Sequence, residues 1–143
     1  MTVSAWFRPG PGQPWIAGTG FRAQTTEQIT AVGHLGGRWL AGGLRAGDGP
    51  RDQQAMIWTS ADGLSWSRAD GDFAQDDRES SIDDVCAAPD GTPVAVGSIT
   101  DAAGTTIGAL WIEQAGRWQR ADLSAESGPD EGFLTCSTPP VRW

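Results

Sequence analysis

The chain has 143 residues, 38% of them hydrophobic, which is enough for one folded domain with its own core. A net charge of -8 and the absence of lysine argue against binding to the phosphate backbone of nucleic acids, which requires clustered cations. The 20 Gly and 9 Pro follow no collagen-like period, so they favour short strands joined by tight turns over helices.

The sequence offers no membrane span and no leader. Apolar residues never run to the roughly 18 needed to cross a bilayer, and the first six residues lack the basic start and apolar middle of a signal peptide. We favour a secreted or cell-surface location, with any leader outside this sequence. Lysine, asparagine and tyrosine are missing while alanine, glycine, arginine and aspartate abound, a bias expected of a high-GC bacterial genome.

Short apolar or alternating runs bounded by Gly, Asp and Pro follow one another along the chain and are typical of strands in a meander. Two come first, near residues 3 to 8 and 13 to 17. The next eight lie near residues 28 to 34, 38 to 44, 53 to 59, 64 to 69, 81 to 87, 92 to 99, 106 to 113 and 117 to 122. Asp-Gly pairs at Asp62-Gly63 and Asp90-Gly91 stand where hairpins must reverse.

Tryptophan recurs at a fixed spacing and indicates an internal repeat. An apolar-Trp step recurs after 52 and then 53 residues, and the second Trp that follows each step recurs after 51 and 52. The first set is Trp6, Trp58 and Trp111, and the second is Trp15, Trp66 and Trp118. Because equal spacing of a local pattern identifies stacked supersecondary units, we expect these six side chains to form the core between units.

The remainder of the unit repeats more loosely. Residues 29–32 recur as 82–85, residues 39–42 recur as 94–97, and a third copy begins at 132–136. The sequence therefore predicts a single all-β segment built from four-stranded antiparallel units with a period of about 52 residues. It divides into a partial unit at 1–22, full units at 23–72 and 73–124, and the start of a further unit at 125–143.

A β-propeller is the architecture that best suits this unit. A four-stranded sheet with two apolar faces cannot cover both of them alone, and radial stacking buries each face against its neighbour. A solenoid or another stacked or sandwich β fold is the alternative, although solenoid repeats are usually shorter. The segment starts and ends within a blade, and its open edges require other blades, from further copies of the chain or from a longer or partner polypeptide.

One turn resembles a known repeat. Residues 59–66 read Thr-Ser-Ala-Asp-Gly-Leu-Ser-Trp, which is similar to the Asp-box, or BNR repeat, of sialidase-like β-propellers, with one residue fewer between Asp and Gly. The resemblance implies a structural role for Ser60, Asp62, Gly63 and Trp66, because the carboxylate accepts backbone N–H bonds and the Trp packs between sheets. The matching turns before Trp15 and Trp118 have lost the Ser and Asp.

Candidate catalytic groups are few. Sialidase-like catalysis requires a tyrosine nucleophile, which the chain lacks, and His34 is the only histidine and is expected to line a turn or channel. Carboxylates at residues 76, 77, 83 and 84 could supply a glycosidase pair. We therefore expect a non-catalytic binding or scaffolding module for a protein or carbohydrate. The alternatives are a fragment of a sialidase-like glycoside hydrolase and a structural piece that completes another propeller.

Three further features leave alternatives open. Acidic residues between 70 and 84 could hold Ca²⁺ near Asp83 and Asp84, although a solvated loop is the commoner outcome and we expect no cofactor. Cys86 and Cys136 occupy equivalent first strands and form either a disulfide, if their Cα atoms come within about 7 Å, or two buried thiols. Trp143 lies outside the repeated pattern and is the first aromatic to test for stacking on a ligand.

Overall fold

The computed structural model describes residues 6–8, 10–20, 26–47, 52–73, 79–121 and 136. These residues form strands, turns and connecting segments and contain no helix, so the all-β prediction is confirmed. The strands are β1 (Trp6–Phe7), β2 (Ile16–Ala17), β3 (Thr26–Leu35), β4 (Arg38–Ala46), β5 (Gln53–Ser60), β6 (Ser67–Arg68), β7 (Glu79–Ala87), β8 (Pro93–Thr100), β9 (Thr106–Gln114) and β10 (Arg117–Ala121). The described residues accordingly contain no helix long and apolar enough to cross a membrane.

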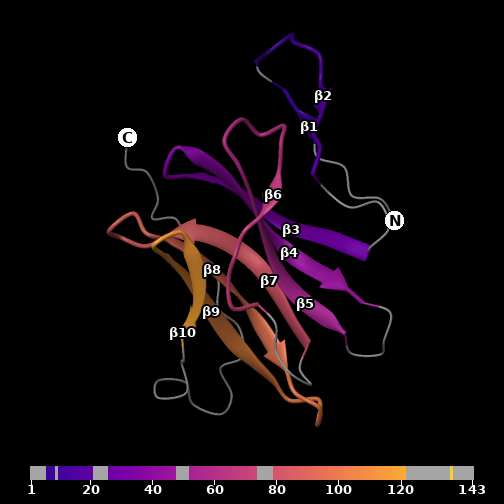
Figure 1. Cartoon of the computed structure of the whole chain (residues 1–143), viewed down its shortest axis with the longest axis vertical. Coiled ribbons are helices and arrows are strands. Elements are labelled where there is room, and N and C mark those ends of the chain that lie inside the picture. Colours follow the sequence, from indigo (N-terminus) through magenta and orange to yellow (C-terminus); the bar gives the residue numbers. More distant parts are fainter. Residues whose placement is uncertain are drawn as a thin grey trace.

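Two four-stranded antiparallel sheets make up most of the structure (Figure 1). The first has the order β3-β4-β5-β6 and the second β7-β8-β9-β10, so neighbours in sequence are neighbours in space. β1 and β2 pair only with each other and project beyond the two sheets in Figure 1. β6 is shorter than predicted because residues 61–66 form a turn that side-chain hydrogen bonds hold in place.

Each sheet contains the same irregularity in its first strand. The register shifts at Thr30 in β3 and at Asp83 in β7, each the extra residue of a β-bulge. A glycine of the next strand lies against each bulge, because a Cβ on Gly43 or Gly97 would come 1.9 Å from a backbone oxygen of the first strand. Gly43 is therefore the counterpart of Gly97, which corrects the sequence alignment of residues 39–42 with 94–97 by one position.

The core lies between the two sheets, where β7 packs across β3, β4 and β5. The largest fully buried side chains of this cluster are Leu40, Ile57, Ile82, Trp111 and Trp118. Burial of a Trp side chain contributes about 4–6 kcal/mol before the entropy cost of ordering. The Thr30 hydroxyl donates to the Ile82 carbonyl, so the first bulge also bonds to the neighbouring sheet.

The segments that leave one unit pair with the end of the next unit. After β2, Thr19 forms a parallel bridge with Ser65, and after β6, Gly71 forms the same kind of bridge with Trp118. The bridged positions are 52 and 53 residues apart, so the link between units follows the sequence repeat. The bridge at Trp118 contains reciprocal backbone hydrogen bonds of 2.9 and 3.0 Å.

The glycine against the second bulge gives the first testable prediction. Gly97→Ala should lower the free energy of unfolding by roughly 2–4 kcal/mol, because its Cβ would meet the backbone oxygen of Ser81 and not a movable side chain. Urea denaturation followed by Trp fluorescence measures the loss. Gly10→Ala is the control, since a Cβ there meets nothing within 4 Å. Equal stability of the two variants would contradict the proposed need for close approach.

Candidate functional site

The turn between β5 and β6 is the most highly organised polar site among the described residues. Asp62 Oδ1 accepts hydrogen bonds from the backbone amides of Leu64 and Ser65, both at 2.9 Å, and from Ser60 Oγ at 3.0 Å. Ser60 Oγ in turn accepts from the Gly63 amide at 2.9 Å. Gly63 has a φ of 76°, which glycine adopts without strain.

The indole of Trp66 completes this turn. Its Nε1 donates to the Gly63 carbonyl at 3.0 Å, and the side chain is buried against Trp58 in the second core cluster of the first sheet. All four residues singled out from the sequence, Ser60, Asp62, Gly63 and Trp66, thus belong to one hydrogen-bonded structure. Its donors and acceptors satisfy one another, so the turn fixes the backbone and leaves Asp62 exposed at its tip.

The electrostatics of the turn follow from these bonds. Hydrogen bonds from the Ser65 and Leu64 amides and the Ser60 hydroxyl hold the pKa of Asp62 below its usual 3.8. In the β7–β8 turn, a hydrogen bond from the Thr92 amide lowers the pKa of Asp90 in the same way. Each carboxylate therefore stabilises its turn in the ionised form.

The turn between β9 and β10 reverses without such side chains. Ala115 and Gly116 take φ values of 51° and 77°, so positive-φ backbone does what the Asp62 bonds do in the first sheet. The two turns also differ in the hydrogen bonding of the tryptophan that follows each of them. Trp118 Nε1 is buried without a hydrogen-bond partner among the described residues, whereas the equivalent Trp66 Nε1 is bonded to Gly63.

The six repeated tryptophans divide into two groups. Trp58, Trp66, Trp111 and Trp118 are buried between or beneath the sheets. Trp6 and Trp15 are 59% and 60% exposed, so the expectation that they are core does not hold in this structure. The physical reason is that β1 pairs with β2 alone, and no inner strands of that unit are present among the described residues.

The ion pairs hold elements together. Arg38 of β4 bonds to Glu113 of β9 and so joins the two sheets, and Arg68 of β6 bonds to Glu27 of β3, which is only 1% exposed. A buried carboxylate requires such a partner because desolvation penalises its charge. At the position equivalent to Glu27 in the second sheet, Ser80 accepts from the Ala55 amide of the first sheet. Sequence reasoning did not single out these residues.

The candidate catalytic and metal-binding residues that the structure describes form no cluster. Asp83 is the exposed residue of the bulge, and Asp84 accepts a hydrogen bond from the Val85 amide at 2.8 Å. Within the described ranges, no group of three His, Cys, Asp or Glu side chains is placed to hold a metal ion. Asp76 and Asp77 lie outside those ranges, so the expectation of no cofactor, with calcium near Asp83 and Asp84 as its alternative, stays a prediction.

His34 and the remaining aromatic candidates are placed as follows. His34 is exposed near the end of β3, and its ring meets the edge of Trp39 at a centroid distance of 4.8 Å. Trp39 packs, partly buried, on the second core cluster. Trp143 lies outside the described residues, and its role as a stacking platform stays a prediction.

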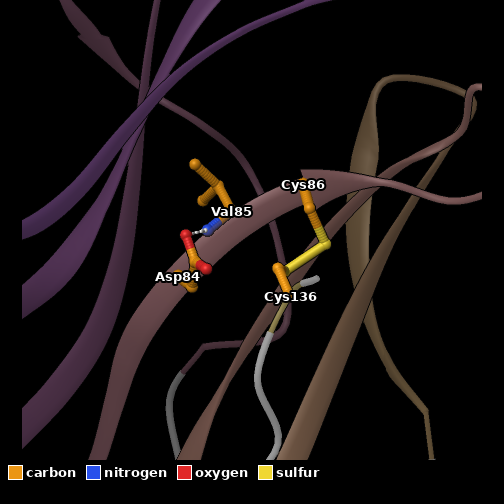
Figure 2. The surroundings of a disulfide bond; sticks show 4 residues. All are labelled: Asp84, Val85, Cys86 and Cys136. Atoms are coloured by element: carbon orange, nitrogen blue, oxygen red, sulfur yellow. Dashed lines mark hydrogen bonds between the residues drawn. A yellow bond between two sulfur atoms is a disulfide. The ribbon is translucent and has the colours of Figure 1, made fainter. Parts of the chain in front are cut away.

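Cys86 and Cys136 form a disulfide, with their Cα atoms 5.9 Å apart (Figure 2). Of the two alternatives that the sequence left open, the structure contains the cross-linked one. The place is informative: Gly33 corresponds to Cys86 in the repeat, and a Cβ on Gly33 would lie 3.3 Å from Val85 of the next unit. The disulfide thus ties β7 of the second sheet to Cys136 at the position where β3 of the first sheet approaches the second.

No protein family, curated protein or solved structure matches the chain. Function is therefore inferred from the geometry of these residues. The offset between units changes from 53 residues in the first strand to 54 at the glycine of the second, because the connection between the first two strands is one residue longer in the second sheet. The bulges leave no such signal, since both units carry the extra residue at the same place.

The Asp62 turn predicts a pH-dependent contribution to stability. Asp62→Asn should lower the urea midpoint at neutral pH, because an amide accepts these N–H bonds less strongly than a carboxylate. The lowered pKa means that this contribution is full above the unfolded value near 3.8 and is lost as the pH falls through the folded value. Midpoints measured from pH 7 to pH 2 should therefore converge for the two proteins.

Asp90→Asn is the matched control for the Asp62 turn. Asp90 is hydrogen-bonded by the amide and the side chain of one residue, Thr92, whereas Asp62 accepts from two backbone amides and the Ser60 hydroxyl. Its substitution should therefore cost less at neutral pH. A gap between wild type and Asp62→Asn that stays constant down to pH 2 would rule out the charge as the cause.

The disulfide predicts a measurable gain in stability. Closing a loop of 50 residues should stabilise the fold by roughly 4 kcal/mol on the chain-entropy model. Cys136→Ser should lower the free energy of unfolding by an amount of that order, and reduction of the wild type should reproduce it. If a reducing agent destabilises Cys136→Ser as much as the wild type, the effect does not come from this bond.

Proposed function

We propose that the chain is a segment of a β-propeller with an Asp-box-type turn, and that it serves as a non-catalytic binding or scaffolding module. The observation that carries the proposal is the repeated link between units. The segments at Thr19 and Gly71 pair in parallel with nearly equivalent positions of the next sheet, Ser65 beside Trp66 in the first and Trp118, the counterpart of Trp66, in the second. Blades of a propeller are stacked through this kind of regular unit-to-unit contact, with each sheet covered by its neighbour.

The position of the charged groups supports a non-catalytic role. Arg38 and Glu113 join the sheets, and Glu27 pairs with Arg68 beneath the surface. Asp62 is engaged in its own turn. These groups hold strands and turns in position.

The turns support a binding role. The β3–β4, β5–β6, β7–β8 and β9–β10 turns each contain positive-φ glycine, at Gly36, Gly37, Gly63, Gly91 and Gly116. Side-chain acceptors fix two of these turns further, Asp62 in one and Asp90 in another. Short turns anchored on a rigid sheet are the usual carriers of recognition residues. We propose a protein or a carbohydrate as the ligand that these turns bind.

Binding and hydrolysis can be tested on the same preparation. Native chain should bind at least one member of a glycan array or a purified protein panel with saturation, and heat-denatured chain should not. With a panel of chromogenic glycosides, the native chain should release no more chromophore than the double variant Asp83→Asn, Asp84→Asn. Turnover that this variant loses would establish a hydrolase instead.

A further inference from the structure

The β1–β2 hairpin has the same register as the outer half of each complete sheet. Trp6 pairs with Ala17 as Trp58 pairs with Arg68 and as Trp111 pairs with Arg120. The three tryptophans lie 52 and 53 residues apart, so the pairing follows the sequence repeat. β1 and β2 are therefore the third and fourth strands of a unit.

The exposure of this hairpin departs from that of its counterparts. Trp58 and Trp111 are 0% exposed, whereas Trp6 is 59% exposed. Trp66 and Trp118 are 8% and 0% exposed, whereas Trp15 is 60% exposed. Trp6 pairs with Ala17, and alternation places Trp15 on the same face as Ala17, so the two exposed tryptophans share one face of the hairpin, whereas Ile16, which pairs with Phe7, lies on the other. Exposed aromatic surface of this kind marks an interaction site.

The two complete sheets identify the strand that belongs beside β1. In both, the third strand lies between the second and the fourth: β5 between β4 and β6, and β9 between β8 and β10. The open edge of β1 therefore takes a second strand. Residues 132–136 of another copy correspond to a first strand, which has no place beside a third. In a second copy, β4 and β8 are already paired along both edges.

The register also specifies side chains on the missing strand. Ala41 lies opposite Trp58 and Ala95 lies opposite Trp111, so a small residue belongs opposite Trp6. The preceding position is Leu40 in one sheet and Val94 in the other, and a glycine follows two residues after each alanine. The strand that fits β1 thus has the pattern aliphatic-Ala-x-Gly, with the glycine against a bulge.

The surface is continuous with an interface already present. The segment after β2 is joined to the first sheet through the Thr19–Ser65 bridge, just as the segment after β6 is joined to the second sheet through Gly71 and Trp118. The hairpin therefore stands where the preceding unit of the stack belongs. Its two inner strands are not among the described residues.

We propose that the β1 edge, with Trp6 and Trp15, is a docking surface for a two-stranded β-hairpin supplied by a partner polypeptide. The hairpin is equivalent to β3–β4 and β7–β8, and it pairs with β1 through a strand of the aliphatic-Ala-x-Gly pattern. This inference rests on the stacked-unit arrangement of the proposed function. Main-chain pairing along β1 supplies affinity, and the small residue opposite Trp6 supplies specificity.

A peptide from the chain itself is the probe. Residues 79–100 with Cys86→Ser contain the β7–β8 hairpin and no tryptophan, so any change in Trp emission comes from the full chain. Titration of the full chain should shift its emission to the blue and slow hydrogen exchange over residues 6–17. The same peptide carrying Ala95→Glu is the matched control and should bind at least about tenfold more weakly, a difference of about 1.4 kcal/mol.

A covalent version removes the demand for high affinity. Fusing the peptide ahead of residue 1 through a Gly/Ser linker raises its effective concentration, so even weak pairing should protect residues 6–17. Trp6→Ser should abolish the protection in both formats. The proposal is overturned if neither format protects residues 6–17, if the Ala95→Glu peptide binds equally well, or if the chain alone dimerises and buries Trp6.

The failures of the two proposals are distinguishable. Loss of hairpin capture with glycan or protein binding intact removes only the docking surface. Capture without any such binding, or together with glycoside hydrolysis, removes the proposed function and leaves the docking surface.

Discussion

The need to cover both faces of each sheet governs this structure. The second sheet buries Trp111 and Trp118 against Leu40 and Ile57 of the first, and neither surface could remain in water without a large cost in hydrophobic free energy. The other contacts between units depend on that approach. The Thr30 hydroxyl reaches Ile82, and Arg38 reaches Glu113, because the sheets are already packed.

The two sheets reach the same outer turn by different means. In the first, Asp62 and Ser60 specify the reversal through side-chain hydrogen bonds, and Trp66 is bonded to the turn itself. In the second, positive backbone angles at Ala115 and Gly116 suffice. The fold therefore needs the reversal and the buried tryptophan, whereas the carboxylate is one of several local solutions. This explains how a turn motif can fade between repeats while the period survives.

Sequence reasoning located the strands because alternation, turn residues and the recurring tryptophans are local signals. It assigned Ser60, Asp62, Gly63 and Trp66 to one turn for the same reason. It misjudged Trp6 and Trp15, since burial depends on strands that lie elsewhere. The bulges at Thr30 and Asp83 and the pair of Glu27 with Arg68 were missed because they arise from register and from neighbours distant in the chain. For Cys86 and Cys136, spacing allowed two states and only the packing of units selected one.

The disulfide also sets the path of mechanical load. A force that pulls on residues before Cys86 and after Cys136 passes through the sulfur–sulfur bond and bypasses residues 87–135. β8, β9 and β10 all lie within that shielded loop, so they bear no tension while the bond is intact. Extension would therefore unravel the first sheet and spare most of the second, and reduction would place the shielded strands under load.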